Sequence, residues 1–300
     1  MLRLFNRKSG TLAKAPDPHR MPEQAWRAAL PEADIRQGLT WLQPETPWCH
    51  YFELADGLRT VTPAQERYFG KALGLKIMAV QLLESIPYIT RAGDVRAISV
   101  LDLACAEGAH SLELAMAGAK RVLGVEGRQL YVDRASFMAK AFGASNAQFI
   151  LGDVRRLDPA QVGRFDLVLF YGILHHLGAE DFLPMLELLR RLTVDTAVIF
   201  THTAEQGADE KFGARLSKPM TTPQGFSGRL YREHPDDASA EEKSKRVRSS
   251  LDNTFSFWAR EGSLLEGLKQ AGFKHISRQL APNPFSRAAD EFRVFYVCRV

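Results

Sequence analysis

Two kinds of hydrophobic pattern alternate along the chain after Gly93. Short continuous apolar runs are separated by stretches in which apolar positions recur at helical spacing. Continuous apolar runs are typical of parallel strands that are buried on both faces, and strands that alternate with helices indicate parallel βαβ units. The runs that we predict to be strands are AISVLDL, RVLGVE, AQFILGD, FDLVLFYGI and DTAVIFTH.

The pattern near the C-terminus completes this sheet. A helical pattern over Ser263–Ala271 stops at Gly272, and the runs KHISRQLA and EFRVFYVCRV after it predict two closing strands. We therefore predict an α/β fold with a doubly wound, seven-stranded, mostly parallel sheet and an antiparallel C-terminal strand. Residues 94–300 would form this domain, with a polar insertion at 204–254 whose charged segment HPDDASAEEKSKRVR is expected to be partly helical.

The first part of the chain predicts an arm and a cap. Residues 1–35 have few periodic apolar positions, so we expect a loosely ordered arm with one short helix near Glu23–Ala29. Residues 36–93 would cap the domain. Within them, turn residues at 55–57 predict a hairpin that joins the aromatic run WCHYFEL to Leu58–Val61.

A long helix is expected in the second half of this cap. Apolar residues recur at helical spacing from Pro63 to Pro87, and Thr62 stands where an N-cap residue is needed.

Composition narrows the classes of protein that the chain can belong to. The formal charge of +4 is small for 300 residues and the basic residues are interspersed with acidic ones, so nucleic acid is allowed but not indicated. Three cysteines without paired spacing indicate neither a disulfide framework nor a metal site. We find no secretory signal and no run of about 18 apolar residues. We therefore expect a cytoplasmic protein that does not bind membranes; its oligomeric state stays open.

Three acidic residues follow successive predicted strands. Asp102 ends the first strand and is followed by the small-residue turn Ala104 to Gly108, which lets the backbone approach a ligand closely. Glu126 ends the second strand, where a carboxylate can accept hydrogen bonds from ribose hydroxyls. Asp153 follows the third strand. All three are expected at the same edge of the sheet.

This succession resembles the AdoMet-binding pattern of class I, Rossmann-like methyltransferases, closely over residues 98–176 and loosely over 177–300. The resemblance implies S-adenosyl-L-methionine (AdoMet) as the cofactor. It also implies that the turn from Asp102 to Gly108 surrounds the methionine and sugar, that Glu126 binds the ribose, and that Asp153 faces the adenine amino group. The chain departs from the family at Ala104 and Ala106, where glycines are frequent.

Electrostatics favour AdoMet over a nicotinamide dinucleotide. A pyrophosphate is bound by backbone N–H groups at a helix N-terminus, and carboxylates at Asp102 and Glu107 would repel it. AdoMet carries a sulfonium and an ammonium group, which an acidic pocket attracts. An oxidoreductase of this fold remains an alternative, because the fold supports many functions.

The acceptor side is expected at the end of the fourth strand, in the run YGILHHL. Ligands of open α/β sheets bind beyond the carboxyl ends of the strands, so Tyr171 is a candidate for the cofactor pocket, and His175 and His176 are candidate general bases. His202, after the fifth strand, is a further candidate. Alternatively, these histidines cap the strand and pack beneath the next helix. No further ligand at helical spacing indicates a metal site.

The function that we predict is transfer of a methyl group from AdoMet to an oxygen, or a nitrogen, of a small molecule. YGILHHL, FWAREGSLLEGLKQAGF and WCHYFELADG also resemble the tRNA wobble-uridine 5-oxyacetic acid methyltransferase-like group, so a tRNA-modifying methyl or carboxymethyl transferase is the first alternative. His175 stands where carboxymethyl-transferring members have tyrosine. A non-catalytic AdoMet-binding module is the second alternative. Interleaved aromatic and basic residues in the insertion are expected to cover the acceptor.

Overall fold

The central sheet has seven strands in the order β11-β12-β7-β6-β3-β4-β5. All neighbouring pairs are parallel except those of β12, which runs antiparallel to both β7 and β11. The predicted sheet and its antiparallel C-terminal strand are therefore confirmed. The strands are β3 (Ser99–Leu103), β4 (Arg121–Glu126), β5 (Ala147–Leu151), β6 (Phe165–Tyr171), β7 (Thr193–His202), β11 (His275–Arg278) and β12 (Arg293–Arg299).

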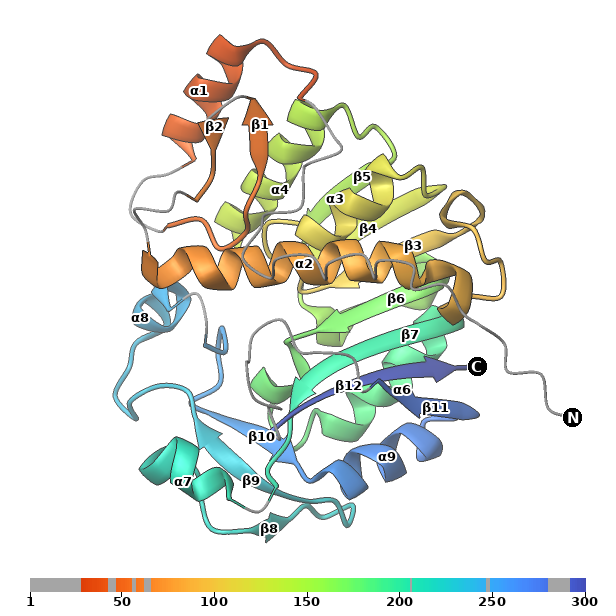
Figure 1. Cartoon of the computed structure of the whole chain (residues 1–300). Helices are drawn as coiled ribbons and strands as arrows, with labels where there is room; N and C mark the ends of the chain where they lie inside the picture. The colour runs from red at the N-terminus through yellow and green to blue at the C-terminus, as the bar shows by residue number, and fades with distance from the viewer. Residues whose placement is uncertain are drawn as a thin grey trace, which may run out of the picture.

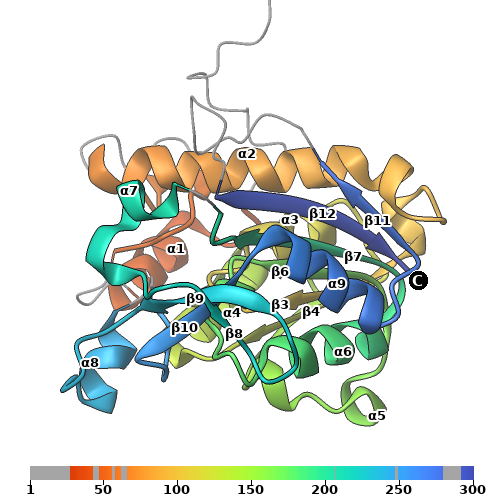
Figure 2. The same ribbon diagram turned by 90° about the horizontal axis from the view of Figure 1, so that it is seen from below.

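Helices cover both faces of this sheet (Figures 1 and 2). In this computed structural model, which describes residues 28–42, 47–55, 58–61, 66–205, 207–246, 249–279 and 292–300, each face has its own hydrophobic core. Val100 packs in one core and Leu101 in the other, because successive side chains of a strand point to opposite faces. The helices are α2 (Glu66–Ile89), α3 (Ala109–Met116) and α4 (Gln129–Phe142) on one face, and α6 (Phe182–Leu192) and α9 (Glu261–Gln270) on the other. The short α5 (Pro159–Val162) lies near the beginning of β4, where the Arg121 guanidinium donates to the backbone oxygen of Val162 at 3.0 Å.

The cap differs from the prediction at its N-terminal side. Helix α1 (Glu32–Trp41) begins inside the stretch that was expected to be a loosely ordered arm, and Ile35 and Leu39 bury its inner face. Ala28 and Ala29, the end of the expected short helix, are not helical, and the rest of that helix lies outside the described residues. Ile35 and Leu39 are only four positions apart, and one such pair of apolar residues is too short a periodic pattern to predict α1.

The hairpin and the long helix of the cap agree with the prediction. Strands β1 (Glu53–Ala55) and β2 (Leu58–Arg59) pair antiparallel. Helix α2 continues two residues beyond Pro87, which lies in its last turn, while the expected cap residue Thr62 is outside the described residues. By length and composition, Lys71–Ile89 is the one candidate membrane span in the described part of the chain, and 44% of it is buried inside the protein.

The insertion carries a second sheet that the prediction missed. Strands β8 (Met220–Thr221), β9 (Ser227–Arg232) and β10 (Phe255–Ala259) form an antiparallel sheet in the order β10-β9-β8. The inserted structure therefore extends to Ala259 instead of ending at residue 254. Helix α7 (Ala208–Phe212) precedes this sheet, and α8 (Ala240–Lys245) confirms the predicted helix in the charged segment, where Ser239 and Glu242 form a capping box.

Candidate active site

The turn after β3 adopts the backbone conformation for which the family uses glycine. Ala104, Ala106 and Gly108 have φ angles of 57°, 47° and 77°, so all three are left-handed. This conformation costs a residue with a Cβ atom about 1–2 kcal/mol. Alanine has the smallest side chain of all residues with a Cβ, so it is the smallest change from glycine. The departures at positions 104 and 106 therefore keep the geometry of the turn.

Asp102 and Glu126 are buried at the ends of adjacent strands, with 3% and 4% of their surfaces exposed. Ser111 Oγ donates to Asp102 Oδ2 at 2.6 Å, whereas Glu126 accepts from the backbone N–H groups of Ala106 at 3.0 Å and Arg128 at 2.9 Å. Burial raises the pKa of Asp102 to about 7 and also raises the pKa of Glu126. Because each carboxylate oxygen has two lone pairs, Glu126 can still accept hydrogen bonds from ribose hydroxyls.

Glu107 has a different environment from the one we expected. Its carboxylate accepts a bond from Arg134 Nη1 at 2.7 Å and bonds from the backbone N–H groups of Cys49 and His50, and both ionic side chains are fully buried. Through these bonds, the pair of Glu107 and Arg134 joins the cap to the turn after β3. Because Arg134 balances the charge of Glu107, the expected repulsion of a pyrophosphate by Glu107 is wrong. Of the two carboxylates expected to act in this way, Asp102 remains.

Asp153 lies after β5, at the same sheet edge as Glu126, since Gly152 N–H donates to the backbone oxygen of Glu126 at 2.9 Å. Its carboxylate caps the short helix of residues 154–156 by accepting from Arg155 N–H at 2.9 Å, and it also pairs with the Arg155 guanidinium. Although partial burial acts to raise the pKa of Asp153, the bonds from Arg155 outweigh it and lower that pKa.

Two buried polar atoms near Asp102 have no hydrogen-bond partner in the described structure: Tyr171 Oη and His110 Nε2. Their rings meet edge to face, with centroids 4.8 Å apart. Burial and then the charge of Lys76 lower the pKa of His110 to about 4, so its ring is neutral. Buried polar atoms normally have partners, and the methionine end of AdoMet offers both donors and acceptors. These residues therefore fit the cofactor.

His175 is buried just after β6, and hydrogen bonds to its Nδ1 fix the orientation of its ring. The N–H of His202 donates to this nitrogen at 3.4 Å, and Thr201 Oγ1 lies 3.2 Å from it. Burial, followed by the neighbouring His176, His202 and Arg293, lowers the pKa of His175 well below its ordinary value. A nitrogen that accepts a backbone N–H carries no proton, so the neutral ring is protonated at Nε2. These hydrogen bonds do not support His175 as a base.

His176 forms a histidine–carboxylate pair with the insertion sheet. Its Nδ1 lies 2.7 Å from Glu233 Oε1, and Ser256 Oγ donates to the same oxygen at 2.8 Å. Burial alone would raise the pKa of Glu233, but the bonds from His176 and Ser256 hold it below its usual value. The ionised Glu233 therefore keeps the proton of His176 on Nδ1, which leaves the lone pair on Nε2. The His176 side chain is 20% exposed.

Glu233 and His110 are site residues that were not predicted from the sequence. Glu233 directly follows β9 and lies 57 residues from His176; an alternating polar pattern in RLYREH was the only available signal. Phe226 and Phe257 of the insertion pack in the core that contains Leu101, whereas Tyr231 stacks on Trp258 with ring centroids 4.3 Å apart. Among the described residues, no cluster of three or more His, Cys, Asp or Glu side chains is arranged to hold a metal ion.

Comparisons with known proteins agree with this geometry. A family model described as a methyltransferase domain matches residues 100–195. The N-terminal domain of EvdMO1, solved with S-adenosylhomocysteine (SAH) bound, is 25% identical, with a TM-score of 0.66 and coverage of 90% of this chain and 98% of that one. The chain covers 48% of the EvdMO1 structure that extends beyond this domain. No curated protein sequence matches the chain.

A more distant structure shares the fold. Magnesium protoporphyrin IX methyltransferase (ChlM) from Synechocystis PCC 6803, solved with bound SAH, is 15% identical with a TM-score of 0.52, and the match covers 89% of this chain and 94% of that one. The sheet order, the turn after β3 and the family model define the chain as a class I, Rossmann-like, AdoMet-dependent methyltransferase. Since 1144 solved chains match, the fold alone does not specify the methyl acceptor.

Proposed function

We propose that the protein transfers the methyl group of AdoMet to a hydroxyl oxygen of a small-molecule acceptor, with His176 as the general base. The pair of His176 and Glu233 carries this proposal. A hydroxyl is a weak nucleophile until its proton is removed, whereas a neutral amine attacks without prior deprotonation. An oriented base at the end of β6 therefore favours oxygen over nitrogen as the acceptor atom.

The chain's own residues bind, orient and move one proton in this reaction. Bound AdoMet supplies a methyl carbon on a sulfonium, whose bond to sulfur breaks as the acceptor oxygen forms its new bond. Nε2 of His176 takes the hydroxyl proton, and the charge of Glu233 stabilises the resulting imidazolium. His175 holds the neighbouring backbone through its bonds to Trp258 and His202. Asp102 and Glu126 bind the cofactor.

A sugar hydroxyl is the first acceptor to test. The neighbouring N-terminal domain of EvdMO1 was also crystallised in the presence of SAH and D-fucose, at 25% identity and a TM-score of 0.64. We therefore propose incubating the protein with methyl-labelled AdoMet and a panel of deoxysugars, phenols, carboxylic acids, amines and unmodified tRNA. Label in a small-molecule hydroxyl supports the proposal. Label in tRNA alone would instead support the tRNA-modifying alternative.

The methionine end of the cofactor is proposed to lie against Tyr171 and His110. Removing the hydroxyl in Tyr171→Phe is expected to weaken SAH binding by about 10- to 150-fold, because one hydrogen bond to an ionic group contributes about 1.5–3 kcal/mol. Binding of 5′-methylthioadenosine, which lacks the amino-acid end, should stay within about twofold. Calorimetric titration measures both affinities.

The remote variant Tyr88→Phe, at an exposed tyrosine on α2, is the control and should change neither affinity. Equal weakening of both ligands by Tyr171→Phe would contradict this placement of the methionine end.

A further inference from the structure

A short part of the insertion, residues 249–254, lies across the edge of the sheet that carries Glu126 and Asp153; we call it the clasp. It meets this edge at two places. Leu251 comes within 3.0 Å of the position that a Cβ would take on Gly127, directly after β4. Asp252 Oδ2 accepts a bond from Arg155 Nη2 at 2.5 Å, two residues after Asp153.

The same local device anchors the clasp at both places. In Glu126-Gly127-Arg128, the N–H of Arg128 donates to the Glu126 carboxylate at 2.9 Å, while its guanidinium donates to the backbone oxygen of Ser249 at 3.0 Å and to those of Ser244 and Arg246. Each arginine of this device therefore fixes a carboxylate through its backbone and the insertion through its side chain.

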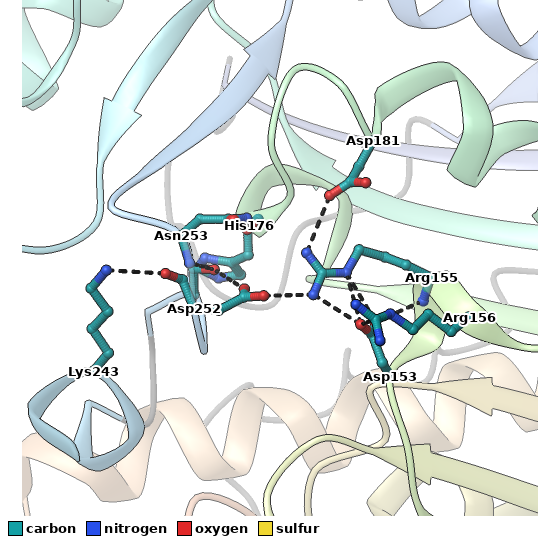
Figure 3. A network of polar contacts seen from close by, with 9 residues as sticks. Asp153, Arg155, Arg156, His176, Asp181, Lys243, Asp252 and Asn253 are labelled. Carbon is teal, nitrogen blue, oxygen red and sulfur yellow. Dashed lines mark hydrogen bonds and ion pairs between the residues drawn. The ribbon is translucent and has the colours of Figure 1, made fainter. Parts of the chain in front are cut away.

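The second copy of the device is Asp153-Val154-Arg155. The N–H of Arg155 donates to the Asp153 carboxylate at 2.9 Å, and its guanidinium bonds Asp153, Asp181 and Asp252. Figure 3 shows Arg155 between these three carboxylates. Asp153, Asp181 and Asp252 share this one guanidinium. The position of the clasp therefore depends on the conformation of Asp153, and the conformation of Asp153 depends equally on the position of the clasp.

The clasp also reaches the proposed base. Asn253 Nδ2 donates to the backbone oxygen of His176 at 3.1 Å (Figure 3). Lys243, on α8, holds the clasp from the other side through the backbone oxygen of Asp252 and the hydroxyl of Thr254. One segment thus connects Glu126 and Asp153, the acidic residues expected at the adenosine, with His176, the proposed base.

We propose that the clasp closes over the adenosine end of the cofactor and positions His176, so that cofactor binding completes the catalytic site. This inference rests on the proposed function. Arg128, Arg155 and Asn253 are then positioning residues: the two arginines couple the carboxylates to the clasp, and Asn253 couples the clasp to His176. Ligands that carry adenosine stabilise the clasp, and a stable clasp increases the affinity for adenosine.

Hydrogen exchange of the full-length protein tests the coupling, with SAH as the probe. In the wild type, SAH is expected to slow amide exchange in residues 249–254 about tenfold, and in Asp252→Asn about twofold or less. The same substitution should weaken SAH and 5′-methylthioadenosine equally, by about two- to fivefold, as expected for a half-exposed ion pair. Asp252→Glu, which keeps the charge, should restore part of the protection.

Glu241→Gln is the matched control, because Glu241 lies on α8, pairs with Lys245 of the same helix and is exposed. It should leave both the affinity and the protection unchanged. Asn253→Ala separates the second function of the clasp: it should lower kcat for methyl transfer about fivefold without raising KM for AdoMet. SAH binding that leaves exchange in residues 249–254 unchanged would overturn the clasp proposal alone, whereas a wild-type protein that binds no SAH would contradict the proposed function.

Discussion

Replacing His176 by alanine is expected to lower kcat for methyl transfer by about 10²- to 10⁴-fold, the range that a positioned general base contributes. The ring is held by Glu233 through Nδ1, so its Nε2 is the atom that would accept the hydroxyl proton. SAH affinity should change by less than about threefold, since we assign His176 to the acceptor and not to the cofactor. Initial rates with the acceptor found in the labelling screen, together with SAH titration, measure the two effects.

Glu233→Gln provides a second variant of the same pair. Glutamine still accepts the Nδ1 proton but lacks the charge that stabilises the imidazolium, so kcat should fall about tenfold or more. His275→Ala, at an exposed histidine on β11, is the control and should retain full activity. A His176→Ala protein with unchanged kcat would contradict the assignment of the base, and the acceptor would then need no deprotonation.

Replacing Glu126 by alanine is expected to weaken SAH binding by about 10²-fold or more. Each hydrogen bond from a ribose hydroxyl to the carboxylate contributes about 1.5–3 kcal/mol, and the substitution also leaves the N–H groups of Ala106 and Arg128 without their acceptor. Glu126→Gln keeps an acceptor oxygen and should lose less affinity. Calorimetry measures the affinities, and thermal unfolding checks that the variants are folded.

Glu113→Gln is a suitable control for the loss of a buried carboxylate away from the ribose, because Glu113 pairs with Lys76 between α2 and α3. It should retain SAH affinity within about threefold, even though breaking a buried ion pair lowers stability. Tight SAH binding by Glu126→Ala would show that the ribose does not lie at this carboxylate.

The sheet could be predicted because its signals are local. Each strand from β3 to β7 is a short apolar run between helical patterns, and parallel pairing follows from the alternation. Asp102 and Glu126 could be placed for the same reason, since the carboxyl ends of adjacent parallel strands must meet at one edge. The turn after β3 was also predictable from its small residues, whereas its left-handed backbone at two alanines was not.

Contacts between distant segments could not be predicted in this way. Glu233 meets His176 only because the insertion folds into a sheet of its own, and a six-residue strand such as β9 has little periodicity to reveal it. The pairing of Glu107 with Arg134 likewise depends on how α4 and the cap pack against the turn. A sequence pattern places a charge on an element but does not give its partner.

The central claim is that the edge formed by Asp102, Glu126 and Asp153 binds the adenosyl cofactor. Calorimetric titration of the purified wild-type protein with AdoMet, SAH and NADH tests it most directly. We expect micromolar binding of both adenosyl ligands and no binding of NADH. Binding of NADH alone, or of none of the three ligands, would contradict it.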